Sequence, residues 1–145
     1  MQVHVHASRI IPHPIAKIWP LLRNFNGLPD WHPMIARSQI EDDLCSDQVG
    51  AIRSFYTHAG DHIRETLLAL DDHRHRVTYN ILESHMGVSQ YVADIQLLPI
   101  TANPSQCLMV WTAEFDCASD RAEELARSIE WDVFQAGMKA LEMLA

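Results

Sequence analysis

The sequence predicts an α+β domain in which a seven-stranded antiparallel sheet packs against one long C-terminal helix. Apolar and polar residues alternate in most segments before residue 116, which is typical of strands with one buried face. Residues 119–144 instead carry apolar residues at helical spacing. A sheet with one face to bury needs a cover, and only this last segment is long enough to provide it.

The N-terminal part is predicted to form a strand followed by two short helical segments. The first residues, MQVHVHASRI, alternate between apolar and polar side chains, as a strand does. In segment 12–25, Pro14 suits the first helical position, and Pro20 should kink or shorten the helix because it lacks an N–H. Residues 27–35, GLPDWHPMI, form a short helix or turn bracketed by prolines. The first helix has its apolar residues at helical spacing: Ile15, Ile18, Trp19, Leu22 and Phe25.

Six further strands follow these helices. Tight turns at HAG, DDH and TANPS join three of the strand pairs, because these stretches combine small, polar and turn-forming residues. The order of elements is therefore one strand, two short helices, six antiparallel strands and a helix. The six strands are predicted at about 36–41, 49–57, 61–70, 74–83, 91–100 and 106–116.

The C-terminal segment is predicted to be one helix over residues 119–144. Ser119 is a suitable N-cap, and acidic residues follow it near the positive end of the helix dipole. At 1.5 Å per residue such a helix is roughly 39 Å long. Its apolar stripe is predicted to comprise Leu125, Ile129, Val133, Ala136, Ala140 and Leu144.

Length and composition indicate a single domain over residues 1–145 and exclude several classes of protein. The net charge of −8 without a basic stripe argues against nucleic-acid binding, and no segment suits a transmembrane helix or a signal peptide. Cys45, Cys107 and Cys117 are widely spaced, which favours reduced thiols in the cytoplasm. Neither the nine histidines nor the few glycines show metal-ligand or phosphate-loop spacing, so we expect no metal and no cofactor.

One predicted hairpin, AIRSFYTHAGDHIRETLLAL, places two opposite charges among apolar residues. A three-residue loop with Gly60 in the left-handed conformation sets Arg53 directly opposite Glu65. Ionised side chains are almost never fully buried unless they are paired, so a salt bridge is expected. The same face carries the apolar residues Ala51, Phe55, Ile63, Leu67 and Ala69.

Three roles remain open for this pair. It can be a satisfied ion pair that sets the strand register, it can orient a ligand, or it can take part in acid–base catalysis. The planar guanidinium of Arg53 suits a carboxylate or an enolate oxygen. Beside that cation Glu65 should stay ionised, which suits a hydrogen-bond acceptor better than a general acid.

The remaining strands extend this inward face towards a cavity. Alternation places Tyr79 and Glu83 on it, and Tyr91 and Trp111 continue it on later strands. A curved sheet wrapped around one helix leaves a space that its side chains need not fill. Apolar walls with a few polar groups are typical of a small-molecule site. Aromatic packing is the competing role for both tyrosines.

Three further residues are candidates at the edge of this cavity. Trp31 and His32 lie in the proline-bracketed segment that should border the opening. His32 has an ordinary pKa suited to proton transfer, although a solvated or capping role competes with catalysis. Gly137 lies within the helix, where glycine costs about 1 kcal/mol relative to alanine, so a close approach is expected there, either of packed protein or of a ligand.

Several stretches together resemble the polyketide cyclase/dehydrase-like branch of the START-related SRPBCC superfamily. They cover nearly the whole chain in order: IPHPIAKIWPLLRNFNGLPDWHP, GAIRSF, IRETLLALDD, YNILES, QYVADIQL and VWTAEFD. The resemblance implies a helix-grip fold, a seven-stranded antiparallel sheet around a long C-terminal helix that encloses an apolar ligand cavity. The superfamily includes hormone receptors, lipid carriers and aromatic cyclases, so its fold alone does not fix the function.

We therefore expect a protein that binds a small hydrophobic or amphipathic molecule, such as a lipid, an aromatic compound or a polyketide-like metabolite. The alternative is a polyketide cyclase or dehydratase that folds its substrate and polarises a carbonyl, with Arg53, Glu65 and His32 as catalytic candidates. A protein–protein module with a vestigial cavity and a homodimeric assembly both stay open. The candidate ligand-binding residues are Trp31, Arg53, Phe55, Glu65, Tyr79, Glu83, Tyr91, Trp111, Val133 and Gly137.

Overall fold

The computed structural model describes all 145 residues of the chain. Seven strands and a C-terminal helix form in the predicted order, with α1 and the 3-10 helix η1 between the first two strands. The strands are β1 (Gln2–Ile11), β2 (Ile35–Ile40), β3 (Ile52–Thr57), β4 (His62–Asp71), β5 (Arg76–Glu83), β6 (Ser89–Pro99) and β7 (Cys107–Asp116). The helices are α1 (Ile15–Arg23), η1 (Leu28–Asp30), η2 (Glu41–Asp43), η3 (Ser119–Arg121), α2 (Ala122–Ser128), η4 (Ile129–Gln135) and α3 (Ala136–Glu142).

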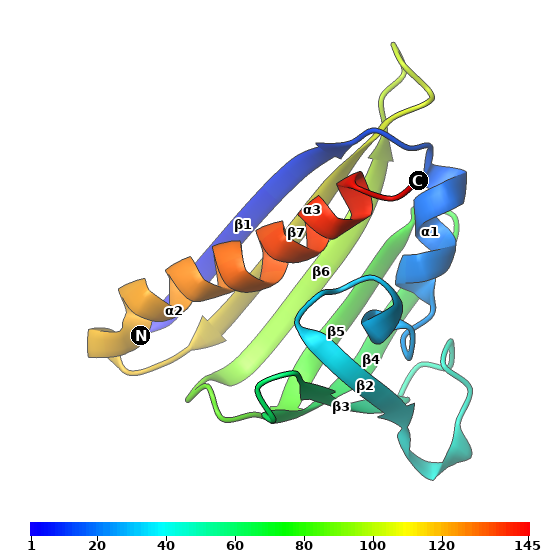
Figure 1. Ribbon diagram of the computed structural model, residues 1–145. Coiled ribbons are helices and arrows are strands. Elements are labelled where there is room, and N and C mark those ends of the chain that lie inside the picture. The colour runs from blue at the N-terminus through cyan, green and yellow to red at the C-terminus, as the bar shows by residue number, and fades with distance from the viewer.

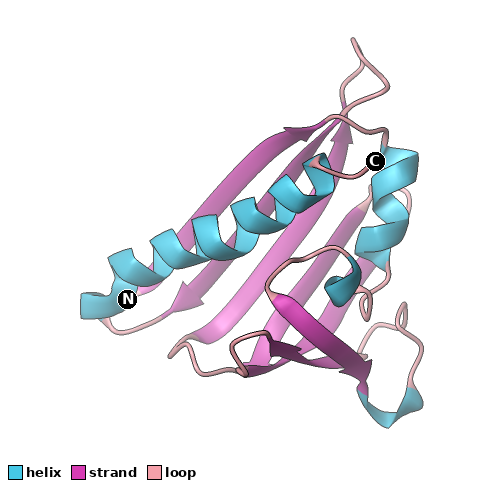
Figure 2. Cartoon of the chain, viewed as in Figure 1, coloured by secondary structure: helices cyan, strands magenta, loops and turns pink.

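All seven strands belong to one antiparallel sheet in the order β1-β7-β6-β5-β4-β3-β2. The sheet curves strongly, and the C-terminal helix crosses its concave side (Figure 1). Apart from short helical turns, the helices gather on that one side of the sheet (Figure 2). The predicted fold class, a curved sheet around one long helix, is confirmed.

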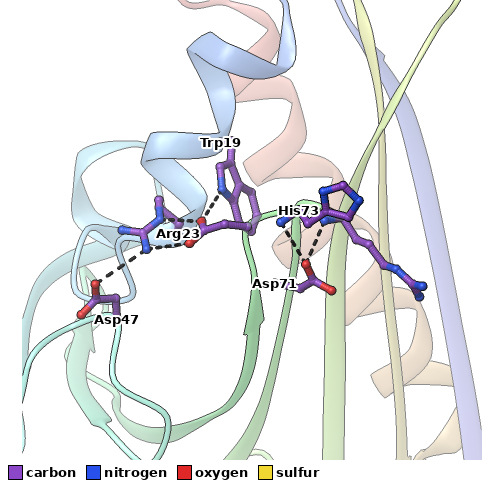
Figure 3. A network of polar contacts seen from close by, with 7 residues as sticks. Trp19, Arg23, Asp47, Asp71 and His73 are labelled. Atoms are coloured by element: carbon purple, nitrogen blue, oxygen red, sulfur yellow. Dashed lines mark hydrogen bonds and ion pairs between the residues drawn. The ribbon is translucent and has the colours of Figure 1, made fainter.

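The first helix is shorter than expected and closes one end of the sheet. It begins at Ile15, one residue later than predicted, with Pro14 as its N-cap, and it accommodates Pro20 within its nine residues. Trp19 and Arg23 both donate hydrogen bonds to the Asp72 carboxylate, at 2.8 Å to Oδ1. Figure 3 shows this network, which ties α1 to the turn between β4 and β5.

The C-terminal helix is continuous, but its middle section is a π-helix. The buried positions run Leu125, Ile129, Phe134, Met138 and Leu141, with a step of five residues at the start of the π-helical section. A π-helix bonds residue i to i+5, so each turn contains more residues and the buried face moves along the chain. The predicted stripe is therefore right for Leu125 and Ile129, and Val133 and Leu144 also pack against the core. Ala136 and Ala140 are only partly buried, because the buried positions after the π-helical turn are Phe134, Met138 and Leu141.

Two bulges overturn details of the predicted inner face. The pairing of β4 with β5 shifts by one residue between Leu67 and Ala69, so Ala69 is exposed. A second shift follows Ile81, and Glu83 consequently pairs with Arg64 on the outer face, where its side chain is 64% exposed. A bulged residue reverses the alternation of every residue after it.

No helix in the structure is both long enough and apolar enough to cross a membrane.

Candidate ligand-binding cavity

A cavity of about 390 Å³ lies between the concave side of the sheet and the first half of the C-terminal helix. Ligand pockets generally measure about 300–1,000 Å³, so this volume is sufficient for a small molecule. Of the 25 residues that line it, 14 are hydrophobic. The lining includes seven of the ten predicted binding residues: Arg53, Phe55, Glu65, Tyr79, Tyr91, Trp111 and Val133.

Arg53 and Glu65 form a buried ion pair at the inner end of the cavity. They are directly opposed in the β3–β4 register, as predicted, and each is only 6% exposed. Both Nε and Nη2 of Arg53 reach the same carboxylate oxygen, Oε1, at 2.8 and 2.7 Å. The remaining terminal nitrogen, Nη1, donates to the carbonyl of Phe25 at 3.2 Å.

The flat guanidinium group is also covered by aromatic rings. The ring of Phe25 lies 4.0 Å from the guanidinium carbon, and that of Tyr79 lies 4.8 Å from it. Cation–π contacts of this kind favour a buried arginine. Burial raises the pKa of Glu65, and the neighbouring cation of Arg53 opposes that shift, which is the direction of effect expected from the sequence.

The two tyrosines bring hydroxyl groups to the same region. Trp111 Nε1 donates to the Tyr79 hydroxyl at 3.1 Å, so Tyr79 acts as an acceptor towards the protein and keeps its own proton free. Tyr91 stacks on Phe115 with ring centroids 5.5 Å apart. Burial raises the pKa values of the Tyr79 and Tyr91 hydroxyls well above the usual range of tyrosine, so both stay protonated at neutral pH.

His32 lines the cavity but has both ring nitrogens occupied. Its Nε2 lies 2.7 Å from the carbonyl oxygen of Val133, and its Nδ1 accepts a hydrogen bond from the backbone N–H of Met34 at 3.1 Å. A carbonyl can only accept, so Nε2 carries the proton and the ring is neutral. Burial lowers the pKa of His32. This geometry gives His32 the role of joining η1 to the helix, and it leaves no lone pair for a general base.

Three predicted binding residues lie outside the cavity lining. Glu83 points away from it because of the bulge in β5. Gly137 is buried against the 3-10 turn, since a Cβ at this position would lie 2.8 Å from Cδ2 of His32 and 3.0 Å from Cζ3 of Trp31. Trp31 is buried in turn between Gly137 and Trp111. The close approach expected at Gly137 is therefore protein packing and not a ligand.

The opening of the cavity is formed by loops that the sequence did not single out. His58 and Asp61 come from the β3–β4 hairpin, and Met86 comes from the loop between β5 and β6. Arg121, at the start of the helix, donates a hydrogen bond to the carbonyl of Met86 at 2.7 Å. Gly87 makes room for this contact, because a Cβ there would lie 2.8 Å from Nη1 of Arg121. Gly87 also has a positive φ of 77°, which favours glycine, but this angle is known only from the folded structure and could not be read from the sequence.

No group of three or more His, Cys, Asp or Glu residues lies close enough together to hold a metal ion. On the first strand, Nδ1 of His4 lies 3.5 Å from a carboxylate oxygen of Glu114.

Comparison with solved structures finds the same fold in several proteins. XoxI from Bacillus cereus is 28% identical, with a TM-score of 0.85 over 97% of this chain and 93% of that one. A protein from Thermobifida fusca is also 28% identical, with a TM-score of 0.84 over 96% and 90% of the two chains. Norcoclaurine synthase from Thalictrum flavum, in complex with dopamine and hydroxybenzaldehyde, is 16% identical with a TM-score of 0.76 over 98% and 85%, which shows the fold alone.

Comparison with sequences identifies one family, although no curated protein matches the chain. The family described as polyketide cyclase / dehydrase and lipid transport matches residues 2–145. That match covers nearly the whole chain and includes every strand, the helix and all residues that line the cavity. The chain therefore belongs to the polyketide cyclase/dehydrase and lipid transport family.

Proposed function

We propose that this protein binds a small, largely apolar molecule in the cavity between its sheet and its C-terminal helix. The observation that carries the proposal is the cavity itself, which is mostly hydrophobic and ends in a buried polar group, Glu65, with one oxygen unpaired. Apolar walls provide affinity in proportion to the area they bury, and a few polar groups fix the orientation of a ligand. The family description, which includes lipid transport, supports the same function.

A packing-only role for this region accounts poorly for the space. Protein interiors are packed to the density of organic crystals, and voids larger than a water molecule are rare. A mostly hydrophobic cavity of about 390 Å³ that opens to solvent instead leaves apolar side chains against water, and a bound apolar molecule would cover them. This favours ligand binding over a protein–protein module with a vestigial cavity.

A cyclase or dehydratase is the second candidate, and one observation favours it. Glu65 is a buried carboxyl with a raised pKa that faces the cavity near the Tyr79 and Tyr91 hydroxyls. Carboxyls with raised pKa values serve as general acids or bases at neutral pH. With His32 fully hydrogen-bonded, Glu65 is the acid–base group that this reaction would use. Conversion of a poly-β-keto thioester by the wild-type protein, lost in Glu65→Gln, is the result that would establish catalysis.

The binding proposal is tested with 2-methylnaphthalene, an apolar probe, by equilibrium dialysis. Val133→Phe places a larger side chain on the helix where it lines the cavity, so we expect it to weaken probe binding at least tenfold. Glu123→Phe is the matched control, because it adds the same ring at an exposed helical position outside the lining. Thermal unfolding shows whether both variants remain folded. Equal binding by the wild type and Val133→Phe would contradict the proposal.

A further inference from the structure

We propose that the ligand presents a neutral hydroxyl group, phenolic or alcoholic, to Oε2 of Glu65, and that the cavity excludes carboxylates. This inference rests on the proposed function, because it names the class of molecule that the cavity takes. It also departs from one of the roles that the sequence left open, in which Arg53 binds a ligand carboxylate or enolate oxygen.

Arg53 already directs all three of its nitrogens towards the protein. Two of its nitrogens converge on Oε1 of Glu65, and the third donates to the Phe25 carbonyl. Phe25 and Tyr79 lie against the guanidinium group, at 4.0 and 4.8 Å from its central carbon. A carboxylate is bound well when a planar guanidinium meets it with two parallel N–H groups. Here the two neighbouring N–H groups of Nε and Nη2 already donate to Glu65.

Glu65 provides the opposite kind of group, a hydrogen-bond acceptor. Its Oε1 accepts from both nitrogens of Arg53, whereas Oε2 makes no hydrogen bond to the protein. The side chain is 8% exposed and lines the cavity, so the cavity is where Oε2 can find a donor. Oε2 is not among the fully buried atoms that lack a partner, so it can be reached from the cavity. An apolar ligand would cover it and leave it without a donor, whereas a ligand O–H group would donate to it.

The charge balance decides between a neutral ligand and an ionised one. Arg53 and Glu65 cancel one another, and no other charged side chain lies at the inner end of the cavity. A ligand carboxylate would bring a second anion next to Oε2 without a free cation, and an ammonium would lie close to Arg53. Burying an ion without a partner is strongly unfavourable. The hydroxyls of Tyr79 and Tyr91 suit a neutral ligand, because each can donate or accept.

Three probes of one shape separate these possibilities by equilibrium dialysis at pH 7. They are 2-naphthol, 2-methylnaphthalene and 2-naphthoate, which carry a hydroxyl, a methyl and a carboxylate at the same position. We expect 2-naphthol to bind about tenfold more tightly than 2-methylnaphthalene, a difference of about 1.4 kcal/mol. We expect 2-naphthoate to bind more weakly than either.

The Arg53→Met/Glu65→Leu double variant removes the acceptor without leaving a lone buried charge. In it the preference for 2-naphthol should disappear, while 2-methylnaphthalene still binds. The matched control is Arg64→Met/Glu41→Leu, which removes an ion pair of 2.6 Å between the outer face of β4 and η2 and should leave the preference intact. Circular dichroism establishes that each variant is folded.

The outcomes distinguish this inference from the proposed function. If 2-methylnaphthalene binds but 2-naphthol binds no better, or if 2-naphthoate binds most tightly, the hydroxyl inference is overturned and the binding function stands. A preference for 2-naphthol that persists in the double variant also overturns it, because Glu65 is then not its cause. If neither neutral probe binds the wild type, the proposed function fails as well.

Discussion

Gly137 and His32 meet where the C-terminal helix lies on the turn that follows η1, and no side chain fits between them. A Cβ on Gly137 would lie 2.8 Å from Cδ2 of the imidazole. The same approach lets Nε2 of His32 reach the Val133 carbonyl, one helical turn before the glycine, at 2.7 Å. The glycine therefore provides the space in which the histidine fastens the turn to the helix.

Substitution of Gly137 by alanine should destabilise the protein, although alanine is the better helix former. The added methyl group collides with the ring of His32, and overpacking of this kind costs about 1–3 kcal/mol. The gain in helix propensity is about 1 kcal/mol, so a net loss of about 1 kcal/mol is expected in urea unfolding. The His32→Ala/Gly137→Ala double variant should lose less stability than the two single changes added together. Strict additivity would show that the two residues do not interact.

The sequence was sufficient for the fold and for the central ion pair because local chemistry sets both. The turn with Gly60, at φ 92°, fixes the β3–β4 register, and that register brings Arg53 opposite Glu65. Glu83 and Gly137 were misjudged for a different reason. The bulge that turns Glu83 outwards has no sequence signal of its own, and the partner of Gly137 is set by how the helix lies on a segment about 100 residues earlier.

Removal of one partner of the buried ion pair should be costly. Glu65→Gln leaves the Arg53 guanidinium buried without a counter-ion, and we expect a loss of about 3 kcal/mol in the free energy of unfolding. Arg53→Met/Glu65→Leu should recover much of that loss, because apolar residues of similar volume need no partner. An unchanged unfolding midpoint for Glu65→Gln in urea would contradict the buried pairing.

His32 should make the protein less stable in mild acid. Burial lowers its pKa in the folded state, so the unfolded chain takes up the proton first as the pH falls below about 6.5. Stability is then lost from that pH down to the folded pKa, with a slope of up to about 1.4 kcal/mol per pH unit. Glu65, whose pKa is raised, acts in the opposite direction over the range above its own ordinary value.

The contribution of His32 is isolated by comparing variants. His32→Gln, followed by urea unfolding between pH 5 and 8, should show a smaller loss of stability in acid than the wild type. His58→Gln is the matched control, because His58 is exposed and makes no side-chain hydrogen bond. Parallel curves for the wild type and His32→Gln would show that His32 does not titrate differently in the folded protein.

Arg121 should control how fast a ligand enters and leaves the cavity. Its guanidinium lies against Gly87 and donates to the Met86 carbonyl at 2.7 Å, which holds the β5–β6 loop against the start of the helix at the cavity opening. Arg121→Ala removes this contact, so the loop opens more easily and the dissociation of 2-methylnaphthalene should be several-fold faster in stopped-flow fluorescence. The inner walls do not change, so the affinity should change much less than the rates.

Arg127→Ala, a change on the same helix outside the cavity lining, is the control. Equal dissociation rates for Arg121→Ala and the wild type would place the entry route elsewhere, away from the contact between Arg121 and Met86.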